Sequence, residues 1–271
     1  MRLNKLGILA VVSAFMLSLV GCGGSGFRTA DQIKEDGKLY VATNAEFAPF
    51  EYKEGSNFVG IDMDIINLFA TEHLGVECVI KDQDFDAALL SVSTNKTDIA
   101  IAAITANDKR RETLAFSDSY YTANQVVIVK SDSAYASLTT EAEILAALSA
   151  NKATIGVQRG TTGQYYAEGD ADWGFDGIAN AKVQTYDNGG IATNALSNGQ
   201  IDAVIIDAAP AQILASKFNN VKVLDVVLTE EEYAIAVAKG NDSLVAELNT
   251  FIASIKASGK FDEIVNKYYT E

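Results

Sequence analysis

A short apolar segment of the chain ends in groups that could hold a small anion. Residues 98–104 combine β-branched and small apolar side chains, which predicts a buried strand of a parallel sheet. The run ends at Thr105, and Asn107 and Asp108 are good N-cap residues for a helix starting there. In open α/β sheets, ligands bind just beyond the carboxyl ends of the strands. We therefore expect a hydroxyl and free backbone N–H groups to face a ligand at this point.

Two arginines, Arg110 and Arg111, lie in the helical turn predicted next. A planar guanidinium beside the N–H groups of a helix start suits a carboxylate better than other small groups. The alternative is that both side chains only solvate a surface turn, as most arginines do. The strand-to-helix context favours a binding role for one of the two, and the spacing does not say which.

The first predicted strand, at 38–43, also ends in residues that could contact a ligand. It leads into a loop that carries Asn44, Glu46 and Phe47. The carboxyl ends of parallel strands meet at one edge of a sheet, so we expect this loop to face the same crevice. Phe47 could stack on the apolar part of a ligand, or it could pack under its own loop.

The second half of the chain repeats this arrangement. A strand predicted at 154–158 ends in Arg159-Gly-Thr-Thr-Gly163, whose donors could meet an anion, although a plain tight turn is the alternative. A strand predicted at 200–207 ends in Asp207, where a carboxylate is costly without a partner. A ligand ammonium is one such partner. An N-cap role for a helix at 208–216 is the other interpretation.

Length and internal pattern predict two lobes of α/β class. Segments 88–102 and 195–206 both contain a helix end, a polar turn, an aspartate and a buried strand. This loose internal similarity fits two similarly built lobes rather than a solenoid. A chain of 271 residues is long enough for about two domains. The 48% apolar and 21% charged residues are ordinary for a globular protein.

Several of these segments resemble a known family. Residues 103–110, Ala-Ile-Thr-Ala-Asn-Asp-Lys-Arg, and 116–121, Phe-Ser-Asp-Ser-Tyr-Tyr, resemble the signature of the polar amino-acid binding proteins of ABC importers. These are the extracytoplasmic solute-binding proteins of family 3. Residues 43–50 and 60–64 add to the resemblance, which covers nearly all of the chain beyond its N-terminal segment. The family usually has proline where this chain has Asp108, a conservative change at a helix start.

The resemblance implies a fold and a mechanism. The fold is an α/β, two-lobe, periplasmic-binding-protein-like fold of type II, with a ligand cleft between lobes joined by two crossing strands. Lobe 1 would comprise residues 27–126 and 232–271, and lobe 2 residues 127–231. A free amino acid that touches both lobes stabilises the closed form, because only that form makes both sets of contacts. A permease in the membrane would then recognise the closed protein, which we expect to be a monomer.

The resemblance also implies roles for individual residues. Thr105 and Arg110 would grip the α-carboxylate with backbone groups near Ala103, while the second arginine matches a variable surface position. Thr162 would add a carboxylate contact from lobe 2, and Asp207 would receive the α-amino group. With two aromatic walls and residues at the crevice edges, the residues expected to bind the ligand are Asn44, Glu46, Phe47, Phe85, Ala103, Ile104, Thr105, Arg110, Gln158, Thr162 and Asp207.

The identity of the amino acid is left open at this stage. Glu46 could favour a cationic side chain, whereas Arg159 could disfavour one. Neither cofactor nor metal is expected. The segment that resembles the family least is 173–177, Trp-Gly-Phe-Asp-Gly, which we interpret as a surface loop.

Charge, histidine and cysteine content exclude several classes of protein. The formal net charge of −15, without a basic patch, argues against nucleic acid as a partner. His73 is the single histidine of the sequence, which argues against a histidine-based zinc site and a Ser-His-Asp triad. Cys78 lies in a strand-like apolar run, where a thiol is usually a small hydrophobic group.

The N-terminal segment predicts export and anchoring. Residues 1–21 have a basic start and a short apolar core, as a signal peptide does. Leu19-Val-Gly-Cys22 resembles a bacterial lipobox, in which the cysteine is lipidated after cleavage. Residues 22–26 would then be a flexible, lipidated tether. The protein is therefore expected outside the cytoplasm, held to the outer face of the cell membrane by lipid on Cys22.

Two functions from other classes compete with transport. The same scaffold occurs as cyclohexadienyl or arogenate dehydratase, an enzyme that needs a carboxylic acid in the pocket to protonate a leaving hydroxyl. Glu46 is the candidate for that acid. A ligand sensor that signals to a receptor is the other alternative. A second membrane segment or an attached signalling domain would favour the sensor, and the sequence has neither.

Overall fold

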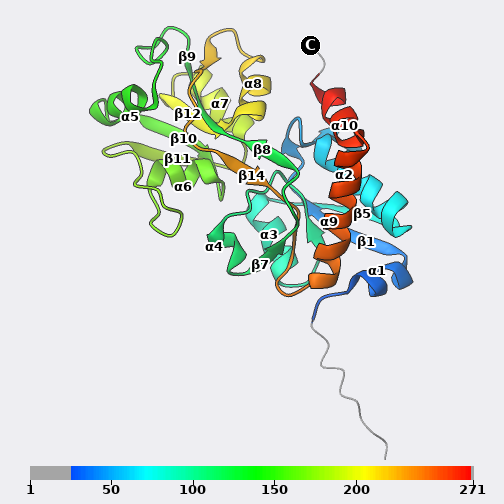
Figure 1. Ribbon diagram of the computed structural model, residues 1–271. Helices are drawn as coiled ribbons and strands as arrows, with labels where there is room; N and C mark the ends of the chain where they lie inside the picture. The colour runs from blue at the N-terminus through cyan, green and yellow to red at the C-terminus, as the bar shows by residue number, and fades with distance from the viewer. Residues whose placement is uncertain (1–25, 270–271) are drawn as a thin grey trace, which may run out of the picture.

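The computed structural model describes residues 26–269, which form two lobes with a β-sheet each (Figure 1). The predicted signal peptide at 1–21 and the predicted lipidation site Cys22 lie outside the described residues. So does the predicted tether, except for Gly26. The mixed α/β, two-lobe fold expected from the sequence is confirmed.

The sheet of the first lobe has the strand order β5-β1-β6-β15-β7. β1 pairs in parallel with β5 and β6, whereas β15 is antiparallel to both β6 and β7. The last part of the chain thus inserts between strands from its first half. The five strands are β1 Lys38–Thr43, β5 Glu77–Asp82, β6 Ile99–Ala100, β7 Leu114–Phe116 and β15 Ala236–Ala238.

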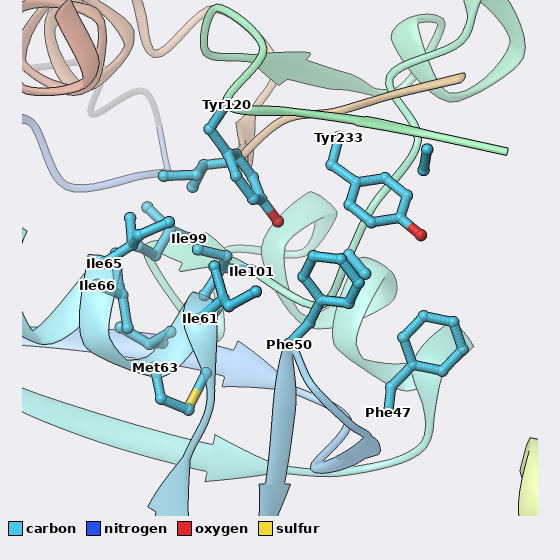
Figure 2. Packing of buried hydrophobic residues seen from close by; sticks show 14 of the residues in the cluster. Phe47, Phe50, Ile61, Met63, Ile65, Ile66, Ile99, Ile101, Tyr120 and Tyr233 are labelled. Carbon is cyan, nitrogen blue, oxygen red and sulfur yellow. The ribbon is translucent and has the colours of Figure 1, made fainter. Parts of the chain in front are cut away.

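Helices cover both faces of this sheet. Leu39, Val41 and Ile99 lie in one buried cluster with residues of α2, whereas Ala42 and Ala100 pack on the other face with α3. This alternation follows from the two-residue period of a strand. Figure 2 shows α2 residues such as Ile65 against Ile99 and Ile101. The helical segments are α1 Ala30–Asp36, α2 Ile61–Leu68, the π-helical turn Phe69–Leu74, α3 Phe85–Ser93, α4 Asp108–Arg111, α9 Asp242–Ala257 and α10 Lys260–Tyr268.

A small antiparallel sheet follows β1 and carries two residues to the edge of the site. It consists of β2 Glu46–Phe47, β3 Glu51–Glu54 and β4 Asn57–Val59. Gly60 closes it with φ of 127°, and a Cβ there would lie 2.1 Å from the backbone oxygen of Phe50. Only glycine fits this close approach without moving the backbone.

The sheet of the second lobe has the order β11-β10-β12-β9-β13. β10 is parallel to β11 and β12, and β9 is antiparallel to β12 and β13. The strand predicted at 200–207 begins only at Ala203. The elements are β9 Gln125–Lys130, β10 Thr154–Gln158, β11 Lys182–Tyr186, β12 Ala203–Asp207 and β13 Val221–Val223, with α5 Glu141–Ala150, α6 Thr162–Glu168, α7 Gly189–Ser197 and α8 Ala208–Ala215.

Two paired strands connect the lobes. β8 Tyr121–Ala123 and β14 Glu231–Tyr233 are antiparallel, with Tyr121 opposite Tyr233. Figure 1 shows them running side by side between the two larger sheets. The expectation of two crossing strands is confirmed. Such a pair can act as a hinge, because a small change in a few backbone torsions moves one lobe against the other.

Candidate functional site

A cavity lies between the two lobes, at the carboxyl ends of their parallel strands. The elements that enclose it are the segments after β1 and β6, the strands β2, β3, β10 and β12, and the helices α3, α4 and α6. The lining residues are Asn44, Phe47, Glu51, Phe85, Ala102, Ala103, Thr105, Arg110, Gln158, Thr161, Thr162 and Asp207.

All but two of the residues predicted to bind a ligand line this cavity. Glu46 is exposed outside it, where its Oε2 accepts a hydrogen bond of 3.0 Å from Nδ2 of Asn188. Ile104 is fully buried in the core beneath. Ala102, Ala103 and Thr105 line the cavity, whereas the side chain of Ile104 packs in the core.

The predicted strand at 98–104 is shorter than expected. β6 has only the residues Ile99–Ala100, and Ala103 has a left-handed backbone with φ of 48°. The N–H of Ala103 donates 2.8 Å to Oδ2 of Asp62 instead of joining the sheet. This buried carboxylate therefore holds the backbone beside the cavity in a conformation that an alanine rarely adopts.

Arg110 is fixed from both lobes. Its backbone N–H donates to Oδ1 of the N-cap residue Asn107. In the side chain, Nη1 donates a hydrogen bond of 2.8 Å to the carbonyl of Thr105, and Nη2 donates one of 3.1 Å to the carbonyl of Gly160. The Phe85 ring lies 5.1 Å from its Cζ. Burial lowers the pKa of Arg110 to about 10, which still leaves it charged at neutral pH. A guanidinium has five N–H donors, so three remain for a ligand.

The hydroxyl of Thr105, in the first lobe, is hydrogen-bonded to the hydroxyl of Thr162, in the second lobe. Oγ1 of Thr105 donates 2.5 Å to Oε2 of Glu231, on the crossing strand β14. Oγ1 of Thr162, at the start of α6, donates 3.3 Å to the Oγ1 of Thr105. The hydroxyl proton of Thr105 is thus used in the hydrogen bond to Glu231. The hydroxyl of Thr162 can instead rotate and donate its proton to a bound anion.

Asp207 lies at the end of β12, opposite Arg110. It occupies the N-cap position of α8, yet its side chain makes no capping hydrogen bond. Its Oδ1 instead accepts 2.6 Å from the Tyr233 hydroxyl. Burial, and next the nearby Glu231, raise the pKa of Asp207 to about 7. Asp207 is thus the N-cap residue of α8, as the other interpretation expected, but its side chain lines the cavity instead of capping the helix.

Glu51 also lines the cavity, and sequence reasoning missed it. The side chain is buried, and its Oε2 has no hydrogen-bond partner. Burial and neighbouring Asp62 raise the pKa of Glu51 well above its usual value. Asp62 accepts hydrogen bonds from the Ala103 N–H and from the Tyr120 hydroxyl, at 2.9 Å, and burial raises its pKa to about 6. Glu51 begins the short strand β3, and the sequence around it contains no motif that marks it as a ligand-binding residue.

The two aromatic residues predicted beside the ligand both lie at the cavity. Phe47 and Phe85 are each 8% exposed and line the cavity. The Phe47 ring also stacks on Phe50, with centroids 6.4 Å apart, and Figure 2 shows these two rings next to each other. The two interpretations of Phe47 are therefore compatible, since it packs on its own loop and faces the cavity.

The lobes are in direct contact around the cavity. Gln158 Nε2 donates 3.1 Å to Oδ1 of Asn44, and Lys109 forms an ion pair of 2.7 Å with Asp172. Arg159, by contrast, is exposed and pairs with Asp187 at 3.1 Å within the second lobe. It does not line the cavity. The structure is thus a closed arrangement of the two lobes.

Other kinds of site find no support within residues 26–269. There, no group of three or more His, Cys, Asp or Glu side chains is arranged to hold a metal ion. No helix in the same range is long and apolar enough to cross a membrane. Burial raises the pKa of the Cys78 thiol to about 12, so it is unreactive at neutral pH.

Comparisons with known proteins agree with this geometry. The model of the bacterial extracellular solute-binding proteins, family 3, matches residues 39–271. A probable histidine-binding protein of Neisseria gonorrhoeae is 32% identical over 98% of this chain and 96% of its own. The arginine-binding extracellular protein ArtP of Bacillus subtilis is 26% identical over 99% of both.

Solved structures give the same result. A mutant of ArgBP from T. maritima has 34% identity and a TM-score of 0.77, covering 89% of this chain and 99% of its own. The ancestral amino-acid-binding protein AncCDT-1, described as a precursor of cyclohexadienyl dehydratase, has 28% identity and a TM-score of 0.78 over 89% and 99%. A family match over most of the chain, a relative above 30% identity and a cavity between two lobes lead to one conclusion: the chain belongs to the bacterial extracellular solute-binding proteins of family 3.

Proposed function

We propose that this protein binds an L-amino acid outside the cytoplasm and delivers it to an ABC importer by closing its two lobes. One observation carries the proposal. Arg110 and Asp207 face the same cavity from different lobes, and among the described residues no hydrogen bond or ion pair joins them. An amino-acid zwitterion supplies one partner for each. Relatives of this chain include a probable histidine-binding protein, an arginine-binding protein and a glutamine-binding protein.

The carboxylate of the ligand would bind at Arg110. The three unused N–H donors of its guanidinium can hold a carboxylate in a bidentate fashion. The hydroxyl of Thr162 lies beside it on the second lobe. A ligand bound here touches both lobes, so it stabilises the closed form over the open one.

The ammonium of the ligand would bind at Asp207. The Tyr233 hydroxyl donates to Oδ1 of this carboxylate, and the ligand ammonium would bind beside it. Glu231 lies close enough to raise the pKa of Asp207, so it also adds negative potential for a cation. This second charge on the crossing strand β14 strengthens the attraction.

The side chain of the ligand would lie between Phe47 and Phe85 and reach toward Glu51. The unpartnered Oε2 of Glu51 favours a side chain that donates hydrogen bonds, and a cation above all. We therefore assign the charge preference to Glu51. Glu46 and Arg159, the two candidates from the sequence, both lie outside the cavity.

The limits of the lobes follow from the two crossing strands. We propose lobe 1 at 27–126 and 232–271 and lobe 2 at 127–231, with bending near β8 and β14. The permease would recognise the closed form of the protein, which would be a monomer. Export by the signal peptide at 1–21 and a lipid on Cys22 would keep the protein at the outer face of the cell membrane.

A thermal-shift screen of residues 26–271 against the twenty amino acids, ornithine and cystine tests the proposal. A true ligand raises the melting temperature, because it binds only the folded state. Arg110→Ala and Asp207→Asn should abolish this rise and keep the unliganded melting temperature nearly unchanged. Arg111→Ala is the matched control, since its guanidinium lies over the Phe116 ring outside the cavity. If no amino acid raises the melting temperature of the wild type, the proposal is wrong.

Glu51 also favours a second candidate function, that of a dehydratase. A dehydratase on this scaffold needs a protonated carboxylic acid in the pocket, and Glu46, the candidate from the sequence, lies outside it. Burial, and next the neighbouring Asp62, raise the pKa of Glu51, which makes its protonated form easier to reach than that of an exposed carboxyl, and the side chain lines the cavity. Turnover of prephenate or arogenate that Glu51→Gln abolishes would establish the enzyme. Tight binding of an amino acid without such turnover would exclude it.

A further inference from the structure

The loop that least resembles the family reaches the centre of the site. Trp173 belongs to the second lobe, and its ring centroid lies 5.1 Å from Cζ of Arg110 on the first lobe. The Phe85 ring lies at the same distance from that Cζ. Arg110 thus has an aromatic contact from each lobe. A guanidinium within about 6 Å of an aromatic ring centroid is attracted by the ring electrons.

The loop between Gly169 and Gly177 is built to present Trp173. The backbone bridge between Asp170 and Phe175 closes it, and the two glycines pack against each other with φ of 85° and 75°. A Cβ on Gly169 would lie 2.8 Å from the carbonyl oxygen of Asp176, so the base of the loop needs glycine. At its tip, Oδ1 of Asp170 accepts from the N–H of Trp173 at 3.3 Å.

Trp173 is held from behind by its own lobe. Its ring stacks on Tyr165 of α6, with centroids 4.2 Å apart and an interplanar angle of 27°. The next residue back, Asp172, forms the ion pair of 2.7 Å with Lys109, which is adjacent to Arg110. Two consecutive residues of the loop therefore contact two consecutive residues of α4 across the cleft. Opening the lobes would break both contacts.

The arrangement leaves the edge of the guanidinium free for a ligand. The two hydrogen bonds of Arg110 to backbone carbonyls use two of its five N–H donors, and its Cζ lies over the rings of Phe85 and Trp173, 5.1 Å from each centroid. A ring contact of this kind restricts tilting of the plane but uses none of the N–H donors. A bidentate carboxylate contact depends on the orientation of that plane.

We infer that Trp173 is a positioning residue of the binding site: on closure it holds the Arg110 guanidinium in the plane that grips the ligand carboxylate. The inference rests on the proposed function, since it assigns the loop to the same site. The loop thereby makes closure and carboxylate binding depend on each other. Ligand release requires Trp173 to leave Arg110.

Fluorescence can follow this event directly, because Trp173 is the single tryptophan of the sequence. In the wild type, the ligand should change the emission of Trp173 and reduce its quenching by acrylamide. Binding to variants is measured by calorimetry and stopped-flow displacement. Trp173→Ala and Trp173→Leu should bind roughly three- to thirtyfold more weakly, mainly through faster dissociation, and Trp173→Phe should recover part of the loss.

The outcomes separate this inference from the proposed function. Tight binding by the wild type with unchanged affinity and dissociation rate in Trp173→Ala and Trp173→Leu overturns the inference alone. The same holds if the ligand leaves the emission and quenching of Trp173 unchanged. Arg111→Ala is the control and should match the wild type. Absence of any amino-acid binding by the wild type overturns the proposed function and this inference with it.

Discussion

At the scale of single residues, the described side chains around the cavity include more carboxyl groups than cationic groups. Arg110 is the one cationic side chain among the residues described around it, whereas Glu51 and Asp207 both line it. Burial raises the pKa values of these two carboxyls, because removing a charge from water is costly without a partner. The lining therefore has more acidic than basic side chains, which favours a cationic group of a ligand.

Acidification should weaken binding through Asp207. Its carboxylate must be ionised to hold an ammonium, and burial raises its pKa to about 7. Binding then requires loss of a proton from the acid form, so the affinity should fall about tenfold between pH 8 and pH 6. Calorimetry in buffers of different ionisation enthalpy should show proton release at pH 6.5. An unchanged affinity of the wild type across this range would contradict the assignment.

Replacing Glu51 should change which amino acid is preferred. Glu51→Gln keeps the shape but removes the charge that would face the ligand side chain. We expect the affinity for arginine or lysine to fall about ten- to a hundredfold, because a hydrogen bond to a charged group is lost. Affinity for glutamine should change by less than about threefold.

The matched control for this change is Glu46→Gln. Glu46 is exposed and bonds only Asn188, so its replacement should leave all affinities close to those of the wild type. Competition calorimetry with the same set of amino acids measures both variants. An equal loss for every ligand in Glu51→Gln would make Glu51 structural.

At the scale of elements, strand ends were predictable because their signals are local. The apolar run before Asp207 and the Gly-Thr-Thr turn after β10 identify strand ends, and parallel strands bring those ends together. The shift of Ala103 to a left-handed backbone was not predictable. It depends on Asp62, which lies 41 positions away in the sequence. Glu51 and Trp173 were missed for the same reason, since their contacts come from other elements.

The turn between β10 and α6 gives a test at this scale. Gly160 has φ of 76°, and a Cβ there would lie 1.9 Å from Oδ1 of Asp86 on the other lobe. Gly160→Ala should therefore hinder closure and weaken ligand binding about tenfold or more, since left-handed strain adds about 1–2 kcal/mol to the clash. Calorimetry measures the loss. The double variant with Asp86→Ala should recover part of the affinity, and no recovery would show that the clash is not the cause.

Gly60→Ala is the contrasting variant. Its added Cβ would meet the Phe50 backbone within the first lobe, 2.1 Å from the oxygen. Backbone cannot move aside as the Asp86 side chain can, so this change should lower the unliganded melting temperature. The melting temperature of unliganded Gly160→Ala should fall less. The pair thus separates a glycine needed for folding from one needed for closure.

At the scale of the whole molecule, the sequence predicted two lobes but not how they meet. The internal similarity of segments 88–102 and 195–206 indicated two lobes, and the resemblance to the family implied the two crossing strands. The contacts across the cleft, such as Lys109 with Asp172 and Gln158 with Asn44, join residues more than 60 positions apart. No pattern in the sequence around these residues predicts the contacts. The loop that carries Asp172 and Trp173 was accordingly interpreted as surface.

These contacts across the cleft should hold the empty protein closed only weakly. The Lys109–Asp172 pair is exposed, with 39% and 65% of the side chains accessible, and exposed pairs contribute about 0–1 kcal/mol. The unliganded protein should therefore populate open forms, and the ligand should close it. Small-angle scattering should show a smaller radius of gyration with ligand than without. Arg110→Ala should keep the larger radius at the same ligand concentration.

Ligand binding should also raise the free energy of unfolding by an amount that can be calculated. A ligand at a hundred times its dissociation constant stabilises the folded state by about 2.7 kcal/mol, which for a chain of this size raises the melting temperature by about 5–11 °C. A rise together with an unchanged radius would mean that the ligand binds a protein already closed. Hinge motion would then play no part, and the ligand would have to enter through the closed cleft. A rise with compaction instead requires the two charges, one on each lobe, to draw together around a single zwitterion.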